Sequence, residues 1–261
     1  MVSTGLAVSL SGSVLRVTLN RPDSLNSLNE EMLAGIADVL DRAATDARVK
    51  AVRLGGAGRA FSSGGSIGAE DLATASSRRP ADLVGAANRA VRAIVALPRP
   101  VVAAVNGPAV GGGAALALAC DIVLASDSSY FAVAATKIGL MPDCGASALI
   151  AAAAGRVPAM RLALLAERIS APEALQRGLV TAVYPAASFD AKVDKLLGDL
   201  VAGPALAIGK TKASINAVTL GGLDAALQRE KNGQAELLES RDFVEGVAAF
   251  QQRRTPNFTD H

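Results

Sequence analysis

Short apolar runs alternate with longer segments of helical period along most of this chain. Two apolar segments, 6–10 and 14–19, stand on either side of a Ser-Gly-Ser turn and predict an opening hairpin. Further apolar runs, each short enough for one buried strand, cover residues 51–54, 101–105, 122–125, 130–133 and 180–184. Because helical segments separate several of these strands, the pattern favours an α/β fold with right-handed βαβ crossovers.

The first long polar segments repeat apolar residues at the spacing of amphipathic helices. Asn29 is the expected N-cap of a helix that runs from Glu30 to about Ala47, with two glutamates in its first turn. A second helical period covers residues 83–97. Both helices carry one apolar stripe, so we expect each to pack on the sheet by one face.

The second half of the chain is predicted to be increasingly helical. A helical stretch follows from Cys144, Ser170 is expected to cap a further turn, and from Ser188 onward every segment has a helical pattern. We therefore predict two parts, a core of residues 1–187 and an all-helical region of residues 188–261.

Composition and charge exclude several classes of protein. The chain has 261 residues, of which 51% are hydrophobic and 3% aromatic, which is enough for one large α/β domain with an appended piece. Its 26 basic and 24 acidic residues are interleaved, so there is no electrostatic case for binding nucleic acid. No uncharged apolar run is long enough to span a membrane, and the first residues lack the basic start of a secretory signal, so we expect a cytoplasmic protein.

Few side chains of this sequence are suited to nucleophilic or metal chemistry. The single histidine is His261, the last residue, so the interior has no histidine to serve as a general base. The two cysteines, Cys120 and Cys144, form neither a disulfide framework nor a metal-binding cluster. We interpret them as two small buried thiols.

The stretch from Pro100 to Asp121 combines a buried strand, an Asn-Gly-Pro turn, three successive glycines and an Ala/Leu helix. The first four amides of a helix have no internal acceptor, and glycine leaves them uncovered, so a negatively charged oxygen could bind there. Alternatively, the glycines only let the helix pack closely on the sheet. The spacing matches neither a P-loop nor the dinucleotide-binding glycine motif.

Four motifs together resemble the crotonase (enoyl-CoA hydratase/isomerase) superfamily. They are GRAFSSGGSI at 58–67, PVVAAVNGPAVGGGAALALACDIVLAS at 100–126, FAVAATKIGLMPDCGAS at 131–147 and EGVAAFQQRRTPNF at 245–258. The resemblance implies a ββα spiral core with an all-helical C-terminal trimerisation region. It also implies an acyl-CoA thioester as substrate, no separate cofactor or metal, and a homotrimer or a dimer of trimers.

The same resemblance assigns an oxyanion hole to the backbone N–H groups of Gly65 and Gly112. Such a pair stabilises the charge that develops on the thioester oxygen when the neighbouring carbon loses a proton. Hydratases of the superfamily carry two glutamates, and this chain has Ala115 and Ala135 at the matching positions. Because alanine cannot accept a proton, ordinary hydration of a 2-enoyl-CoA is not expected. Ser66 also replaces an aspartate of the first motif.

Asp143 lies where some isomerases of the superfamily have their catalytic aspartate. The surrounding stretch most resembles the ring-epoxide isomerases of the 1,2-epoxyphenylacetyl-CoA type, which also lack both glutamates. We therefore predict an acyl-CoA isomerase in which Asp143 removes a proton from C2 and returns it at C4, or isomerises a ring epoxide. An alternative role for Asp143 is that of an ordinary helix N-cap.

The resemblance also suggests contacts to coenzyme A by Ser24, Leu25 and Ser63, with Phe250 and Arg253 reaching the nucleotide from the C-terminal signature. A solvated basic tail is the alternative for Arg253. Two other functions remain open. One is a non-catalytic acyl-CoA-binding protein, and the other is an aryl-CoA hydrolytic enzyme that uses the aspartate as nucleophile.

Overall fold

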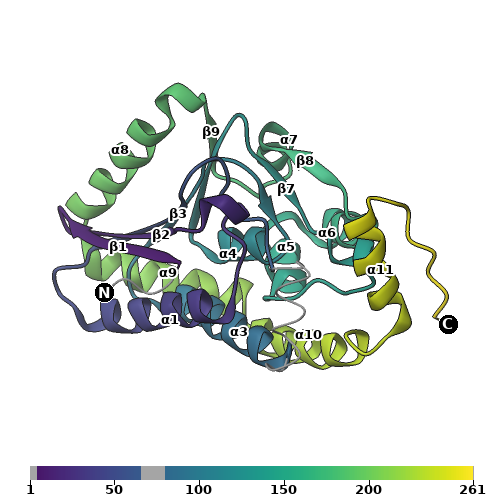
Figure 1. Ribbon diagram of the computed structural model, residues 1–261. Helices are drawn as coiled ribbons and strands as arrows, with labels where there is room; N and C mark the ends of the chain where they lie inside the picture. Colours follow the sequence, from purple (N-terminus) through teal and green to yellow (C-terminus); the bar gives the residue numbers. More distant parts are fainter. Residues whose placement is uncertain (1–4, 66–79, 261) are drawn as a thin grey trace.

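A computed structural model describes residues 5–65 and 80–260 as a mixed α/β structure with two sheets (Figure 1). The larger sheet has the strand order β1-β2-β3-β4-β6-β9, and the smaller has the order β5-β7-β8. In the larger sheet β1 runs antiparallel to β2, and the remaining pairs are parallel. The strands are β1 (Leu6–Ser11), β2 (Val14–Leu19), β3 (Ala51–Gly56), β4 (Val101–Val105), β5 (Ala109–Val110), β6 (Ile122–Ser126), β7 (Tyr130–Ala132), β8 (Arg168–Ser170) and β9 (Ala182–Tyr184).

The chain winds as a spiral in which each turn contributes to both sheets and then to a helix. One turn consists of β4, β5 and α4 (Gly112–Ala119), and β6 and β7 lead through η2 (Ala135–Ile138) into α5 (Ala146–Ala154) in the next. In the preceding turn β3 leads to Ser62, which bridges to Ala109 of β5 before the chain reaches α3 (Pro80–Ala96). This is the predicted ββα spiral core.

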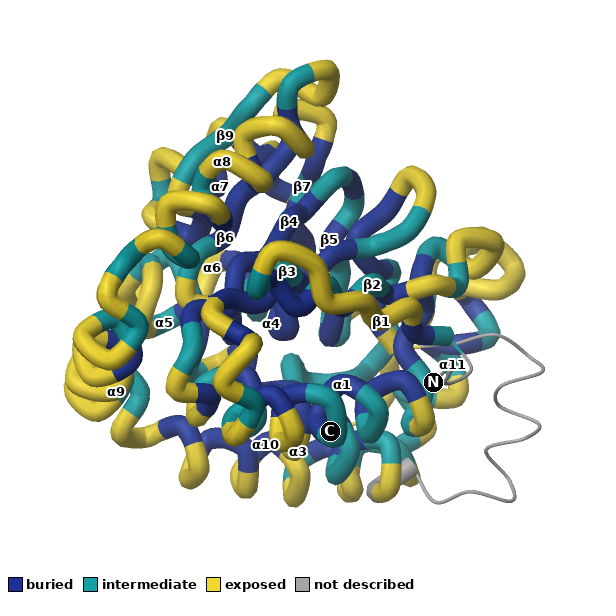
Figure 2. Tube along the Cα trace, turned by 90° about the vertical axis from the view of Figure 1, so that its left-hand side faces the viewer, coloured by how far each residue is buried: buried dark blue, intermediate teal, exposed yellow. Residues whose placement is uncertain are grey.

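The two faces of the large sheet are covered by different helices. Alternate residues of β4 separate into two apolar clusters, because successive side chains of a strand point to opposite faces. Val101, Ala103 and Val105 pack in the cluster that contains α1 (Glu30–Thr45), α3 and α4, whereas Val102 and Ala104 pack against α8 (Phe189–Ala202). Figure 2 shows the inner strands β3, β4 and β6 mostly buried, whereas the edge strand β1 and the outer sides of the helices are exposed.

Most predicted elements are confirmed, and one helix start is wrong. Asn29 accepts from the backbone N–H of Met32 at the start of α1, and Ser170 forms a capping box with Glu173. The helix expected from Cys144 begins only at Ala146. The reason is that Cys144 has a φ of 57°, and the following glycine is also left-handed, which no α-helix accommodates.

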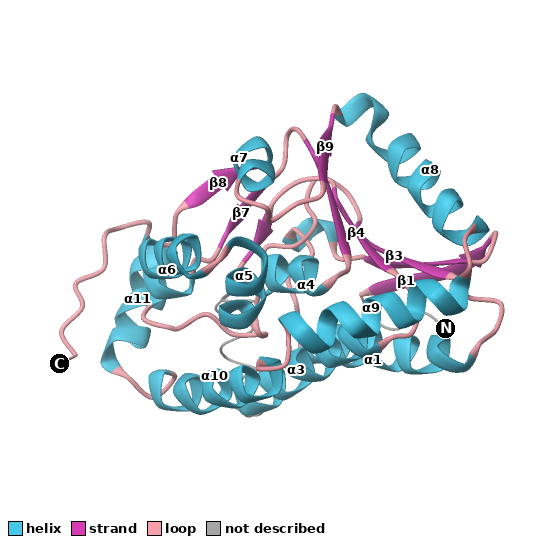
Figure 3. Ribbon diagram, turned by 180° about the vertical axis from the view of Figure 1, so that it is seen from behind, coloured by secondary structure: helices cyan, strands magenta, loops and turns pink. Residues whose placement is uncertain are grey.

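The C-terminal region is helical up to Gln252 and packs along the spiral (Figure 3), but the helical pattern expected beyond that residue is wrong, because residues 253–260 form no helix. After α8 it contains α9 (Ala205–Thr219), α10 (Leu223–Leu237) and α11 (Arg241–Gln252), and α10 contacts both α3 and α5. The division into parts at residue 187 stays a prediction. Both cysteines are buried and free. The remaining elements are η1 (Pro22–Ser24), α6 (Arg156–Leu165), α7 (Ala171–Gln176) and η3 (Ala186–Ser188).

A buried ion pair joins α9 to the start of β6. Lys212 Nζ lies 2.8 Å from Asp121 Oδ2, and the two side chains are only 6% and 17% exposed. The ammonium also donates to the carbonyl oxygen of Ile94 at 2.8 Å, and the carboxylate accepts from the N–H of Val101 at 2.7 Å. Burial raises the pKa of Asp121, while the Lys212 ammonium opposes this shift.

Replacing Lys212 by methionine should lower the free energy of unfolding by about 3 kcal/mol, because a desolvated carboxylate loses its partner. Urea denaturation at neutral pH measures this loss. Lys210→Met is the matched control, since Lys210 is exposed on the same helix. A loss for Lys212→Met no larger than that of the control would contradict the structural role of this pair.

Candidate active site

Gly65 and Gly112 follow two short segments that pair with each other. Ser62 pairs in parallel with Ala109 of β5, and the N–H of Val110 donates to the carbonyl oxygen of Ser62 at 2.9 Å. Gly65 lies three residues after Ser62 and Gly112 three residues after Ala109, so the parallel register carries both glycines in the same direction. The two segments are in close contact here, because a Cβ on Gly64 would lie 3.4 Å from the Gly112 nitrogen.

Both glycine amides are available to a ligand. Gly112 is the first residue of α4, where helix geometry provides no internal acceptor for its N–H. Among the described residues, no group accepts a hydrogen bond from the N–H of Gly65 or of Gly112. The alternative role, in which glycine only permits close packing, applies to Gly113. A Cβ on Gly113 would lie 2.7 Å from the Cβ of Ser62. One glycine thus permits close packing, and its neighbour leaves a donor uncovered.

Asp143 lies on the loop between η2 and α5, directly before Cys144. Its Oδ2 accepts from Gln234 Nε2 at 3.1 Å, and its Oδ1 accepts from the Cys144 thiol at 3.3 Å. The sulfur of Cys144 is also 3.3 Å from the position that a Cβ on Gly112 would occupy. The side chain of Cys144 therefore contacts both the carboxylate of Asp143 and the start of α4.

Burial raises the pKa of Asp143, and the hydrogen bonds from Gln234 and Cys144 oppose that rise. By exposed area the residue as a whole is partly buried, while its carboxyl group is surrounded by protein atoms. A carboxyl group in such surroundings is easier to protonate than an exposed aspartate. These are the properties required of a group that takes up and releases a proton.

The capping alternative for Asp143 is wrong. The N-cap position of α5 is Gly145, and no side chain caps that helix at this position. Glu230 of α10 instead accepts from the N–H of Gly145 at 2.7 Å and from the N–H of Ser147 at 3.0 Å. The carboxylate of Asp143 is consequently not occupied by the amides of α5.

Two functional candidates on α10, Glu230 and Gln234, did not emerge from the sequence. Both are buried, at 1% and 4% exposed, and both contact the loop that carries Asp143. Desolvation raises the pKa of Glu230, opposed by its hydrogen bonds from Ser147 and Gly145. The sequence does contain a signal that these two polar residues are buried. They continue the apolar stripe of Leu223, Ala226 and Leu227 at helical spacing.

The alanines at the expected glutamate positions lie on the elements that frame the site. Ala115 is buried in α4, one turn after Gly112, and Ala135 opens η2, on the path to Asp143. Neither can hold or activate a water molecule. Ser66, the other departure from the family pattern, lies outside the described residues.

The structure brings together the three residues that were expected to contact coenzyme A near the start of the chain. The N–H of Ser63 donates to the carbonyl oxygen of Leu25 at 2.9 Å, and its hydroxyl donates to the carbonyl oxygen of Ser24 at 3.1 Å. Leu25 is left-handed, with a φ of 55°. Because Ser63 leads directly to Gly65, this cluster continues into the candidate oxyanion hole.

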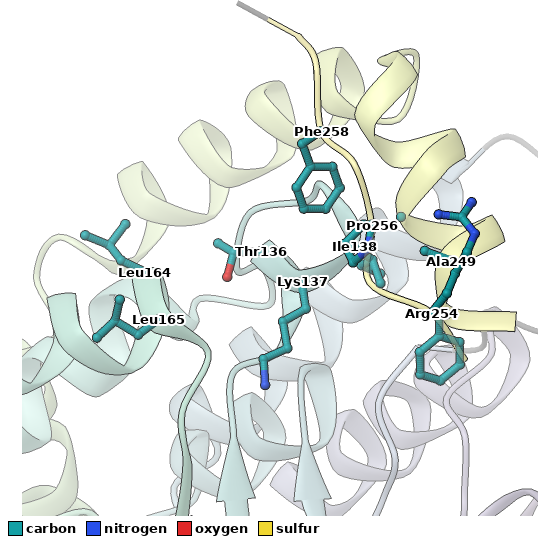
Figure 4. A pocket seen from close by; sticks show the side chains of 11 residues that line it. Thr136, Lys137, Ile138, Leu164, Leu165, Ala249, Arg254, Pro256 and Phe258 are labelled. Atoms are coloured by element: carbon teal, nitrogen blue, oxygen red, sulfur yellow. The ribbon is translucent and has the colours of Figure 1, made fainter. Parts of the chain in front are cut away.

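Phe250 and Arg253 lie apart from that cluster, on α11 (Figure 1). Phe250 is 60% exposed and lines an apolar groove of about 410 Å³ between η2, α6 and the C-terminal segment (Figure 4). Arg253 is the exposed, left-handed C-cap of α11. Within this chain neither residue meets Ser24, Leu25 or Ser63, so their contact with coenzyme A stays a prediction.

Within residues 5–65 and 80–260, no three His, Cys, Asp and Glu side chains form a group that could hold a metal ion. No helix in the same part of the chain combines the length and the apolar character needed to cross a membrane.

A ββα spiral with two uncovered glycine amides at the ends of adjacent turns defines the class of protein as one with the crotonase fold. The family model described as Enoyl-CoA hydratase/isomerase matches residues 9–261. The chain therefore belongs to the enoyl-CoA hydratase/isomerase family and is an enzyme of that family.

Individual relatives agree on the family and differ in the activity that they are named for. The chain is 38% identical to 1,2-epoxyphenylacetyl-CoA isomerase of Escherichia coli, over 94% of this chain and 95% of the relative. It is 40% identical to a probable enoyl-CoA hydratase of Rhodobacter capsulatus, over 99% and 96%. A crystal structure of an enoyl-CoA hydratase from Mycobacterium avium subsp. paratuberculosis K-10 is 60% identical, with a TM-score of 0.92, over 99% of this chain and all of that chain.

Proposed function

We propose that this enzyme is an acyl-CoA isomerase in which Asp143 is the only acid/base that acts on the substrate. The observation that carries the proposal is that Cys144 contacts both the carboxylate of Asp143 and Gly112, the first residue of α4, whose N–H is uncovered. A base and an oxyanion hole on either side of one carbon are the two requirements for forming an enolate from a thioester.

The proposed reaction moves one proton and shifts one double bond. Asp143 takes the proton from C2 of a 3-enoyl-CoA, and the electrons of that C–H bond delocalise onto the thioester oxygen. The amides of Gly65 and Gly112 stabilise the resulting dienolate. Asp143 then returns the proton to C4, and the electrons move back to form the 2-enoyl-CoA. No atoms are gained or lost, so activated water is not needed.

Alanine at positions 115 and 135 supports isomerisation over hydration, because neither side chain can accept a proton from water. The relative named 1,2-epoxyphenylacetyl-CoA isomerase supports a second substrate class, acyl-CoA thioesters that carry a ring epoxide. Both substrate classes are compatible with one aspartate and two amides.

For substrate binding we propose that Ser24, Leu25 and Ser63 hold coenzyme A, and that Phe250 and Arg253 reach its nucleotide, from a neighbouring subunit where necessary. This corresponds to a homotrimer or a dimer of trimers, with no cofactor beyond the thioester substrate, acting in the cytoplasm. Light scattering at several protein concentrations tests the oligomeric state.

Proton NMR of the purified enzyme with 3-enoyl-CoA and, separately, with 2-enoyl-CoA tests the activity. We expect conversion of the 3-enoyl to the 2-enoyl thioester and no 3-hydroxyacyl product. Hydration that is faster than isomerisation would contradict the proposal. Tight binding without turnover of enoyl or ring-epoxide thioesters would indicate a binding protein. A covalent aspartyl ester in the intact-mass spectrum would indicate the nucleophilic alternative.

A further inference from the structure

We propose that Gln234 of α10 is a positioning residue for Asp143, and that Oδ1 of Asp143 is the oxygen that carries the proton. This inference rests on the isomerase function proposed above. It assigns to the C-terminal helical region a direct part in preparing the catalytic group.

The carboxamide of Gln234 is used at both ends. Its Oε1 accepts from the backbone N–H of Met141 at 3.3 Å, and its Nε2 donates to Oδ2 of Asp143 at 3.1 Å. Since a backbone N–H can only donate, the amide oxygen must point toward Met141, and the NH₂ group must point toward the carboxylate. The side chain is 4% exposed, so water does not compete for these bonds.

The two oxygens of Asp143 therefore have different surroundings. Oδ2 receives an amide N–H, which binds an ionised carboxylate strongly. Among the residues that the structure describes, Oδ1 receives only the thiol of Cys144, which is a weak donor. The same sulfur is 3.3 Å from the Cβ position of Gly112, so Oδ1 contacts the residue that packs on the start of α4, whereas Oδ2 contacts α10. The less engaged oxygen is thus the one that can exchange a proton with a ligand.

Further contacts fix α10 against the loop that carries Asp143. One turn before Gln234, the carboxylate of Glu230 holds the amides of Gly145 and Ser147. Between them, Gly233 lets Met141 approach the helix so closely that a Cβ at this position would overlap its sulfur. Three positions of α10, Glu230, Gly233 and Gln234, therefore hold the segment 141–147, which leaves Gln234 little freedom to move.

Gln234→Glu is the sharpest test, because it keeps the volume and the acceptor for Met141 but replaces the donor by a second carboxyl oxygen. The ionised state of Asp143 then loses its main donor and gains a like charge. The titratable groups already beside Asp143, Cys144 and Glu230, are unchanged. In ¹³C NMR titrations of the aspartate carboxyl, we expect the midpoint for Asp143 to rise by about one pH unit or more.

Gln234→Met provides a second variant without an added charge, and it should shift the same midpoint in the same direction by a smaller amount. In the isomerisation assay, the acid limb of kcat/KM should move to higher pH in both variants. The KM for the acyl-CoA should remain within about twofold, since Gln234 does not touch the ligand. Gln228→Glu is the matched control, because Gln228 is exposed on the same helix and its side chain donates to Asn232, away from Asp143.

A midpoint for Asp143 that is unchanged in both Gln234 variants overturns the inference, whether or not the enzyme isomerises. A purely structural role would lower stability and kcat without moving the acid limb. By contrast, absence of isomerisation by the unaltered enzyme would contradict the proposed function and leave the NMR result to decide the role of Gln234.

Discussion

Replacing Asp143 by asparagine is expected to reduce kcat/KM for isomerisation by about 10²- to 10⁴-fold, the usual contribution of a general acid/base. The asparagine side chain has nearly the same shape and can still accept from Gln234 through its amide oxygen. Affinity for a non-reactive acyl-CoA should therefore change little. Steady-state kinetics and calorimetric titration measure the two quantities separately.

The same variant should be at least as stable as the unaltered protein at neutral pH. Burial raises the pKa of Asp143 in the folded state above its ordinary value, so the folded state binds this proton more tightly than the unfolded state does. The associated stability is present at low pH and is lost as the pH rises through the folded-state pKa. Asp143→Asn does not undergo this loss, so its relative stability should increase from about pH 4 upward.

Urea denaturation at several pH values tests this sign and shows that the variant is folded. Retained turnover in Asp143→Asn would remove Asp143 from the mechanism. A variant that is inactive and also unfolded would not support the assignment, which is why the kinetic and stability measurements belong together.

Replacing Gly64 by alanine should reduce kcat/KM by about 10²- to 10³-fold, the effect of losing one oxyanion-hole donor. Gly64 has a φ of +86°, and a Cβ there would lie 2.6 Å from the carbonyl oxygen of Val110. Relief of this overlap must move the segment that leads from Val110 to Gly112. The two amides would then no longer point at one oxygen.

Gly198→Ala is the matched control for this prediction. A Cβ on Gly198 meets nothing within 4 Å, and the residue lies inside α8. That substitution should leave kcat/KM unchanged and stabilise the protein by about 0.5 to 1 kcal/mol, because alanine favours a helix more than glycine does. Full activity of a folded Gly64→Ala variant would argue against a precise amide pair.

Elements with a strong local pattern could be predicted from the sequence. The strand at 101–105 and the start of α1 at Asn29 are correct because an apolar run or a cap residue determines each of them. The strands β5 and β8 have only two and three residues, which is too short for any periodicity to be recognised. Their places depend on pairing with β7, a long-range interaction.

The candidate site likewise contains residues that could be identified from the sequence and residues that could not. The motifs identified Gly65, Gly112 and Asp143, because these residues stand in recognisable local sequences. Glu230 and Gln234 could not be identified, since they lie 85 and 91 residues from the partners that give them a role. Only the fold brings α10 against the loop between η2 and α5.

The most direct test of the central claim is a crystal structure of the enzyme with a non-reactive acyl-CoA analogue. We expect the thioester oxygen to accept from the N–H groups of both Gly65 and Gly112. Oδ1 of Asp143 should lie within roughly 3 to 4 Å of C2. A carboxylate that points away from the bound thioester, with C2 out of its reach, would contradict proton transfer by Asp143.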